Sequence, residues 1–285
     1  MTDELEQVLL LTGKQSTRND AGMDIEGTTI LLTGASSGIG AALSVVLTER
    51  DAHVIIVARR SERLKLVAQQ CRDVGREPTI FAVDLGDLAA AGQLASKLSA
   101  EFATIDCIVN NAAIPRRVPF GRLTMAEVEE TMRVNFLSPA QLTLDLLPAM
   151  LHRQRGLIVN VSSMGGRIPI ANESAYNASK FALAGWSEAM RLDLDGTGVD
   201  VKLILPGPID TEIWDQPGND PAIFDIEKVS ARDCAMGIAD AMQDNGFEYY
   251  IPPLFPGGMD AKAMAVAKYQ SCDDYLTAMA RFSQR

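Results

Sequence analysis

The chain has 285 residues, of which 47% are hydrophobic and 22% are charged. These values favour one large domain with a buried core and argue against a disordered chain. The net charge of −11 argues against nucleic acid as a partner, because phosphates would be repelled. A local basic pocket can still hold an anionic cofactor.

Cysteine and histidine are too scattered to form a zinc site. Cys107 lies in an apolar run, which indicates a buried thiol. No cationic start followed by an apolar core is present, and the run Val8–Leu11 is too short to span a bilayer. We therefore expect a soluble, reduced, cytoplasmic protein with no membrane association. The cysteines and histidines are Cys71, Cys107, Cys234, Cys272, His53 and His152.

Residues Met1–Gly27 are polar and rich in acidic side chains, which predicts a partly mobile extension outside the domain. From Thr28 onward, continuous apolar runs alternate with segments of helical length and period. Such runs are typical of strands buried on both faces. The predicted strands are Thr29–Thr33, His53–Val57, Thr79–Val83, Ile105–Asn110, Leu157–Val161, Val201–Leu205 and Phe247–Ile251. The predicted helices are Ile39–Arg50, Ser61–Val74, Leu88–Phe102, Met125–Arg153, Ala175–Asp195 and Ala231–Gln243.

This alternation predicts an α/β fold with a doubly wound parallel sheet of the Rossmann type, formed by a single domain over residues 28–251. Right-handed crossovers place helices on both faces of such a sheet. Residues 206–230 form a long connection after a strand's carboxyl end, where ligands bind in open parallel sheets. We expect this connection to be a substrate loop. The tail 252–285 forms either a lid over the pocket or a subunit interface.

The run Thr33–Gly40 reads TGASSGIG and lies between the first strand and the first helix. Its glycines let the backbone approach a ligand closely, and a helix N-terminus favours a phosphate. The spacing is G-x-x-x-G-x-G, and an ordinary glycine-rich turn is the plainer interpretation. The same letters fit the G-x-S-x-G elbow of a serine hydrolase, which needs a downstream histidine. His53 and His152 both lie at the amino side of the predicted sheet, so we reject a hydrolase.

The second strand ends with Ala58, Arg59 and Arg60. An acidic side chain at this point would bind the ribose hydroxyls of NAD. Ala58 stands there instead, and the two arginines can pair with a 2′-phosphate. One of them can equally be a solvated charge ahead of the next helix. The sequence favours NADP over NAD.

Tyr176 and Lys180 are four residues apart, so both lie on one face of a helix. A free tyrosine has a pKa of roughly 10 and is a poor acid–base catalyst at neutral pH. A nearby lysine cation would favour the phenolate. The pair alone proves little, because tyrosine and lysine at this spacing are common on solvated helix faces.

Taken together, these motifs resemble the short-chain dehydrogenase/reductase family, in the family's order, over roughly Thr28 to Thr211 and more weakly to Ile251. Ser163 precedes Tyr176 by 13 residues, a spacing typical of this family. Ala113 stands where the family usually has glycine, which affects local packing rather than catalysis. The motifs that carry the resemblance are Thr33–Gly40, Asn110–Ala113, Asn135, Ser163, Tyr176 with Lys180, and Pro206-Gly207.

The resemblance implies a catalytic set of four residues. Tyr176 would exchange a proton with the substrate oxygen, and Ser163 would hydrogen-bond the same oxygen. Lys180 would hold the nicotinamide ribose and lower the pKa of Tyr176. Asn135 would position a water that links Lys180 to solvent. By sequence alone, Ser162 is as good a candidate as its neighbour.

The resemblance also implies the cofactor contacts. Asp84 would lie at the adenine edge, Asn111 would support the cofactor, and Ile209 and Thr211 would meet the nicotinamide carboxamide. The full set of expected cofactor-binding residues is Gly34, Ser36, Ser37, Gly38, Ile39, Gly40, Arg59, Arg60, Asp84, Leu85, Asn111, Tyr176, Lys180, Pro206, Gly207, Ile209 and Thr211.

The expected function is an NADP-dependent oxidoreductase that interconverts a carbonyl and a secondary alcohol on an apolar small molecule. A non-catalytic NADP-binding sensor or scaffold is the alternative. Arg116 and Arg117 can meet an anionic group or be ordinary exposed arginines. The resemblance implies a homodimer or homotetramer, paired through the helices around Leu123–Leu151 and Ala175–Leu194. The apolar residues expected at the pocket are Ile114, Val118, Phe120, Met164, Ile168, Ile213, Trp214 and Phe224.

Overall fold

The computed structural model describes residues 22–223, 227–255, 258 and 260–282. Within them a seven-stranded parallel sheet has the order β3-β2-β1-β4-β5-β6-β9. The chain winds outward from β1 in one direction and from β4 in the other. This is the doubly wound sheet that the sequence predicted. The strands are β1 (Thr29–Thr33), β2 (His53–Ala58), β3 (Thr79–Ala82), β4 (Cys107–Asn110), β5 (Gly156–Val161), β6 (Val199–Pro206) and β9 (Glu248–Ile251).

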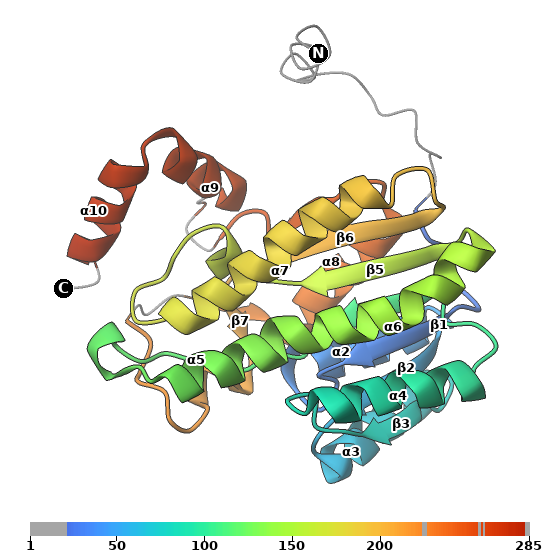
Figure 1. Cartoon of the computed structure of the whole chain (residues 1–285). Helices are drawn as coiled ribbons and strands as arrows, with labels where there is room; N and C mark the ends of the chain where they lie inside the picture. Colours follow the sequence, from blue (N-terminus) through green and yellow to red (C-terminus); the bar gives the residue numbers. More distant parts are fainter. Residues whose placement is uncertain (1–21, 224–226, 256–257, 259, 283–285) are drawn as a thin grey trace, which may run out of the picture.

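Helices cover both faces of the sheet (Figure 1). One core lies between the sheet and α2 (Gly38–Glu49), α3 (Ser61–Val74) and α8 (Ala231–Gln243). A second core lies on the opposite face, under α4, α6 and α7. The bounds of those helices are α4 (Leu88–Glu101), α6 (Ser138–Arg153) and α7 (Ser174–Asp193).

Successive side chains of each strand enter opposite cores, which explains why the strands are continuously apolar. In β1, Ile30 and Leu32 join the first core and Leu31 joins the second. All three are fully buried. Burying a side chain of this size stabilises the fold by roughly 1.5–3 kcal/mol. The thiol of Cys107 is buried, as the sequence predicted.

The helix predicted over Met125–Arg153 is not continuous. It consists of α5 (Met125–Met132), a π-helical turn (Arg133–Leu137) and α6. Thr124 and Glu127 form a capping box that fixes the start of α5. A π turn inserts one extra residue while the apolar stripe continues, so hydrophobic periodicity does not reveal it. Such turns occur frequently at functional sites.

The loop 206–230 has a regular structure of its own. Its ends pair as β7 (Ile209–Asp210) and β8 (Val229–Ser230), a two-stranded parallel sheet. A 3-10 helix, η4 (Glu212–Asp215), follows β7. The indole Nε1 of Trp214 donates to Ile209 O at 2.7 Å, which folds η4 back over the start of the loop. The loop is therefore anchored at both ends against the carboxyl edge of the main sheet.

The domain starts earlier than the predicted boundary at Thr28. Ile25 is buried in the first core, and Met23 N donates to Met242 O at 3.1 Å. Ile25 is a single apolar residue between two acidic ones, so the sequence pattern does not mark it as part of the core. The predicted extension is thus wrong for residues 22–27. The rest of it, with Val8–Leu11, lies outside the described residues.

The tail contains two helices that the sequence did not predict, α9 (Ala261–Gln270) and α10 (Cys272–Phe282). They form a hairpin beside the carboxyl edge of the sheet, shown in red in Figure 1. Ala261 and Ala265 of α9 are buried against Met164 and Ile168 from the β5–α7 connection. The hairpin is therefore packed on the domain next to the strand ends.

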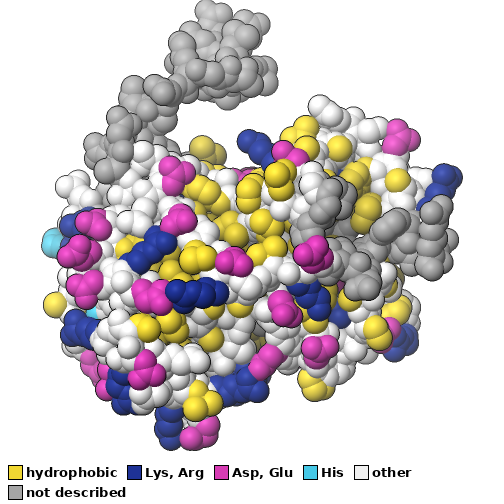
Figure 2. Space-filling model, turned by 180° about the vertical axis from the view of Figure 1, so that it is seen from behind, with side chains coloured by type: hydrophobic (Ala, Val, Ile, Leu, Met, Phe, Trp, Pro, Cys, Tyr) yellow, Lys and Arg dark blue, Asp and Glu magenta, His cyan; other side chains and the backbone are white. Residues whose placement is uncertain are grey.

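No helix of the described chain is long and apolar enough to cross a bilayer. In the same residues, no group of three or more His, Cys, Asp and Glu side chains is placed to hold a metal ion. Figure 2 shows acidic and basic side chains interspersed over one face of the molecule. The described surface of that face offers no broad positive area to a polyanion.

Candidate active site

A cavity of about 890 Å³ lies at the carboxyl ends of β1 to β6. The glycine-rich turn after β1 lines one end, and the α9–α10 hairpin lines the other. A sheet of this topology binds ligands at this edge, where the winding direction reverses. Every predicted catalytic or cofactor-binding residue lines this cavity except Asn135.

The turn between β1 and α2 needs glycine for steric reasons. Gly34 has φ +71°, and a Cβ there would lie 2.7 Å from Ala112 Cα. A Cβ on Gly40 would lie 2.3 Å from Gly34 O. The amide of Asn111 holds the turn against β4, because its Nδ2 donates to Thr33 O at 2.9 Å. Because these glycines have no side chains, the turn exposes its backbone to the cavity at the N-terminus of α2.

The two arginines after β2 have different surroundings. The guanidinium of Arg60 contacts the glycine-rich turn, donating to Ser37 Oγ at 2.7 Å and to Ser36 Oγ at 3.2 Å. It also pairs with Glu212 of η4 at 3.1 Å. Arg59 is more exposed, and its nearest acid, Asp84, is 4.0 Å away. Arg60 is thus the arginine fixed beside the phosphate-binding turn.

Tyr176 and Lys180 lie in the first two turns of α7, with Ser163 opposite them after β5. Ser163 lies close enough to the Tyr176 hydroxyl to favour its phenolate, and its Oγ accepts from Gly165 N at 3.0 Å. The hydroxyl of Ser162 donates instead to Lys180 O at 2.9 Å. The geometry therefore selects Ser163 over its neighbour as the partner of Tyr176.

Burial dominates the electrostatics of this group. It raises the pKa of Tyr176 to about 12, and the nearby Glu173 adds to the effect, whereas Ser163 and Arg117 oppose it. Burial lowers the pKa of Lys180 to about 7. The Lys180 ammonium donates to Val161 O at 2.9 Å and lies 5.8 Å from the Tyr176 ring centre. Lys180 is not among the groups that lower the pKa of Tyr176 in the protein alone, so the predicted effect of Lys180 stays a prediction for the site with its cofactor.

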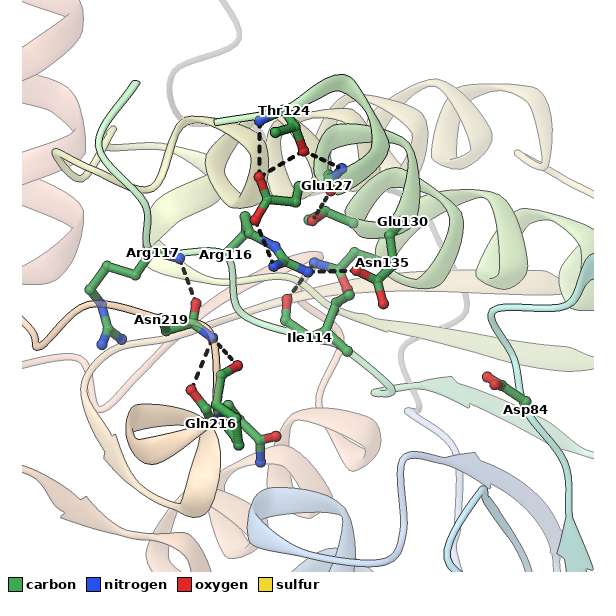
Figure 3. A network of polar contacts seen from close by, with 12 residues as sticks. Asp84, Ile114, Arg116, Arg117, Thr124, Glu127, Glu130, Asn135, Gln216 and Asn219 are labelled. Carbon is green, nitrogen blue, oxygen red and sulfur yellow. Dashed lines mark hydrogen bonds and ion pairs between the residues drawn. The ribbon is translucent and has the colours of Figure 1, made fainter. Parts of the chain in front are cut away.

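Asn135 lies in the π turn and is completely buried. Its side chain pairs with both backbone groups of Ile114, accepting from N at 2.8 Å and donating to O at 3.0 Å (Figure 3). Its Nδ2 also donates to Ser179 Oγ at 3.0 Å, next to Lys180 on α7. Asn135 therefore joins the loop after β4 to the helix that carries Tyr176, and it does so from behind the cavity wall.

Neither Arg116 nor Arg117 of the β4–α5 loop is an ordinary exposed residue. The side chain of Arg116 is largely buried and pairs with Glu127 and Glu130 of α5 (Figure 3). Arg117 is buried and donates from Nε to Glu173 Oε1 at 2.8 Å. Arg116 thus meets acids of its own chain away from the cavity, and the cavity-lining Arg117 already has a buried acid as its partner.

Arg117 also holds the substrate loop. Its Nη1 donates to Asp220 O at 3.0 Å. Its backbone N donates to Asn219 Oδ1 at 2.6 Å (Figure 3). Its guanidinium lies 5.1 Å from the centre of the Trp214 ring. Arg117 therefore fastens the loop 206–230 to the start of α7. No sequence motif indicates this role.

The predicted apolar lining is correct in part. Val118 is buried but does not line the cavity, and Phe120 is 80% exposed. Phe224 lies outside the described residues. Ile114, Met164, Ile168, Ile213 and Trp214 do line the cavity. The sequence reasoning missed Ile170, Glu173 and Ile223 as lining residues. The lining residues Phe255, Met264, Tyr275 and Met279 belong to the tail 252–285, which the sequence analysis gave as a lid or an interface.

The short chain dehydrogenase family model matches residues 28–221, and the chain belongs to this family. The ketoacyl reductase HetN of Nostoc sp. is 33% identical over 183 residues, which cover 64% of this chain and 64% of that protein. A fatty acyl-CoA reductase of Acinetobacter baylyi is 36% identical over 173 residues, covering 60% of this chain and 59% of its own. The chain thus matches less than two thirds of the length of these curated relatives.

Solved structures match over nearly their whole length. A short-chain dehydrogenase from Streptomyces avermitilis is 26% identical with a TM-score of 0.75, covering 92% of this chain and 99% of its own. A metagenomic short-chain oxidoreductase in complex with NADP is 29% identical with a TM-score of 0.68 and covers 80% of this chain and 96% of its own.

Proposed function

We propose that this protein is an NADP-dependent oxidoreductase that interconverts a carbonyl and a secondary alcohol on an apolar small molecule. The strongest support for this proposal is the position of the candidate catalytic residues. Tyr176, Ser163 and Lys180 line the same cavity as the glycine-rich turn and Arg60. A proton-transfer group and a phosphate-binding turn thus share one site.

The residues present fit a dinucleotide. A Cβ on Gly38 would lie 2.9 Å from Thr211, and the N-cap Ser37 makes no side-chain cap to α2. The free amides at this helix start suit a pyrophosphate. Arg60, with Ser36 and Ser37, suits a 2′-phosphate, which favours NADP over NAD. Solved neighbours hold either NADP or NAD, so the preference rests on these three side chains.

When bound, NADPH supplies the hydride for the reduction. The phenol of Tyr176 is protonated at neutral pH because its pKa is about 12, so it donates a proton to the carbonyl oxygen. Ser163 donates a hydrogen bond to the same oxygen and holds it for transfer. Lys180 has donors left beyond its bond to Val161 O, and these suit ribose hydroxyls. In the oxidation direction, the phenolate form of Tyr176 would accept the proton of the alcohol.

The apolar lining supports an apolar substrate. Ile114, Met164, Ile168, Ile213 and Met264 surround the end of the cavity away from the glycine-rich turn. The two relatives described above are named for ketoacyl and fatty acyl-CoA substrates, which carry hydrocarbon chains. A neutral ketone or alcohol with a bulky or chain-like apolar body is the class that this lining accepts.

Replacing Tyr176 by Phe tests this mechanism. We expect turnover of ketones with NADPH to fall by about 10²–10⁴-fold, the usual contribution of a positioned proton donor. The dissociation constant of NADPH should change less than about twofold, because the ring remains. Tyr249→Phe is the matched control, since its hydroxyl contacts Asp244 outside the cavity.

The outcomes separate the alternatives. Retained turnover in Tyr176→Phe would refute the assigned proton donor. A wild type that is stabilised by NADPH in a thermal-shift titration, yet reduces no ketone and oxidises no alcohol, would favour the sensor or scaffold. Stabilisation by NADH alone would overturn the preference for NADP.

A further inference from the structure

The carboxylate of Glu212 lies on the arginine to which the 2′-phosphate of NADP is assigned. Nε and Nη2 of Arg60 contact the hydroxyls of Ser36 and Ser37. The remaining nitrogen, Nη1, donates to Glu212 Oε2 at 3.1 Å. All four residues line the cavity. An anion that belongs to the protein therefore already holds one side of this guanidinium.

A second arginine fixes the same carboxylate. Nη1 of Arg63 pairs with Glu212 Oε1, and Arg63 does not line the cavity. The hydrogen bond from Arg63 lowers the pKa of Glu212, and Arg60 adds to this effect, which outweighs the influence of partial burial. Glu212 is therefore a carboxylate at neutral pH, and its charge is held next to Arg60.

The pair of Arg60 and Glu212 is accessible to a ligand. The two side chains are 43% and 40% exposed. An ion pair as exposed as this one contributes little to stability, so it can be separated. A phosphate monoester carries more negative charge than a carboxylate and has three acceptor oxygens, which makes it the stronger partner for Nη1. The two anions repel each other if both approach the same nitrogen.

Glu212 reaches this arginine from a distant element. The acid that favours NAD is expected at the end of β2, where this chain has Ala58. Glu212 instead lies 152 residues further along the chain than Arg60, in η4 of the substrate loop. The fold thus brings to the site of the 2′-phosphate a negative charge that the end of β2 lacks.

We propose that Glu212 determines cofactor specificity by competing with the 2′-phosphate of NADP for Arg60. Its carboxylate lowers the affinity for NADP and NADPH and leaves the affinity for NAD and NADH unchanged. The preference for NADP is then smaller than Arg60 alone would give. This inference rests on the proposed function, because Arg60 is the residue assigned there to the 2′-phosphate.

The test compares Glu212→Gln and Glu212→Ala with the wild type on two nucleotides. Calorimetry measures the dissociation constants of adenosine 2′,5′-bisphosphate and adenosine 5′-phosphate, which differ only in the 2′-phosphate. Neither probe carries a nicotinamide, so binding is measured without turnover. Asp215→Asn is the control variant, because it removes the same charge from η4 at an exposed residue that does not line the cavity.

We expect both Glu212 variants to bind adenosine 2′,5′-bisphosphate about three- to tenfold more tightly than the wild type does. Their affinity for adenosine 5′-phosphate should change less than about twofold, and so should both affinities of Asp215→Asn. In a protein that already carries Arg60→Ala, the gain from Glu212→Gln should fall below about twofold, because the contested partner is gone.

Unchanged or weaker binding of the bisphosphate in both Glu212 variants overturns the inference. Equal gains for both nucleotides, an equal gain in Asp215→Asn, or a full gain that persists with Arg60→Ala also overturn it, because each indicates a general effect of charge. A wild type that binds neither nucleotide overturns both the inference and the assigned cofactor. The expected gains in a protein that reduces no ketone with NADPH refute the proposed reaction and leave the role of Glu212 standing.

Discussion

Lys180 is fully enclosed between α7 and the end of β5, where its ammonium has Val161 O as a partner at 2.9 Å. Burial lowers its pKa from 10.5 to about 7. Between these two values the unfolded chain carries a proton that the folded protein lacks, so stability rises with pH across this window. Below pH 7 the folded protein must keep a buried cation, which is unfavourable. A residue proposed for cofactor binding thus reduces the stability of the fold.

Replacing Lys180 by Met should therefore stabilise the protein while it abolishes turnover. The melting temperature should rise by about 2–4 °C at pH 6.5, corresponding to about 1 kcal/mol. The gain should shrink as the pH rises from 7 towards 10.5, above which wild-type Lys180 is neutral in both states. Thermal unfolding of both proteins from pH 6 to pH 9.5 measures this difference. A variant less stable than the wild type at pH 6.5 would contradict the prediction.

At the scale of residues, sequence motifs located the candidate site but not its electrostatics. Tyr176 and Lys180 line the cavity as their spacing suggested. The pKa of Tyr176 depends first on burial and then on Ser163, on the nearby Glu173 and on Arg117 from a distant loop, whereas that of Lys180 depends on burial. Tyr275 lines the cavity without any motif, since it comes from a hairpin that packs on the domain. Such contacts exist only in three dimensions, so no local pattern predicts them.

At the scale of elements, Glu212 connects the substrate loop to the turn after β2. Its carboxylate pairs with Arg60 and also with Arg63 of α3. Only Arg60 of these two arginines reaches the serines of the glycine-rich turn. The chain therefore contains two arginines with a shared acidic partner and different access to the expected 2′-phosphate.

Arg60→Ala should raise the KM for NADPH by about 10- to 100-fold, the loss expected for a charge-assisted phosphate contact of about 1.4–2.7 kcal/mol. The KM for NADH should change less than about threefold, since NADH has no 2′-phosphate. Arg63→Ala breaks the same link to Glu212 and serves as the control, with small effects on both cofactors. Steady-state kinetics with both cofactors test this, and equal losses for NADPH and NADH would argue against the phosphate contact.

The elements themselves were predictable to different degrees. Strands buried on both faces produce unmistakable apolar runs, so the sheet and its flanking helices could be located from sequence. The π turn at Asn135 could not, because its extra residue leaves the apolar stripe intact. The hairpin α9–α10 follows the last strand and uses few buried side chains, mainly Ala261 and Ala265. Small residues of this kind give almost no hydrophobic signal.

At the scale of the whole molecule, an exposed apolar stripe runs along α6. Leu137, Leu144 and Leu151 are seven residues apart, which places them on one face of the helix. They are 41%, 60% and 37% exposed. Leu192 of the neighbouring α7 is 76% exposed. A stripe of this kind on two adjacent helices suits pairing with a second copy of the chain, as in the homodimer or homotetramer expected from the family resemblance.

Leu144→Glu should therefore separate the subunits. The substitution places a charge in the middle of the stripe, and in a two-fold contact each chain would bring its own glutamate to the same interface. Light scattering on the eluting protein should give 30.7 kDa for the variant and a multiple of this mass for the wild type. Leu66→Glu is the control, because Leu66 is 67% exposed on α3, away from the stripe. This control variant should leave the assembly intact.

A wild type of 30.7 kDa would show that the stripe does not pair in solution. An unchanged mass in Leu144→Glu would move the interface elsewhere on the surface.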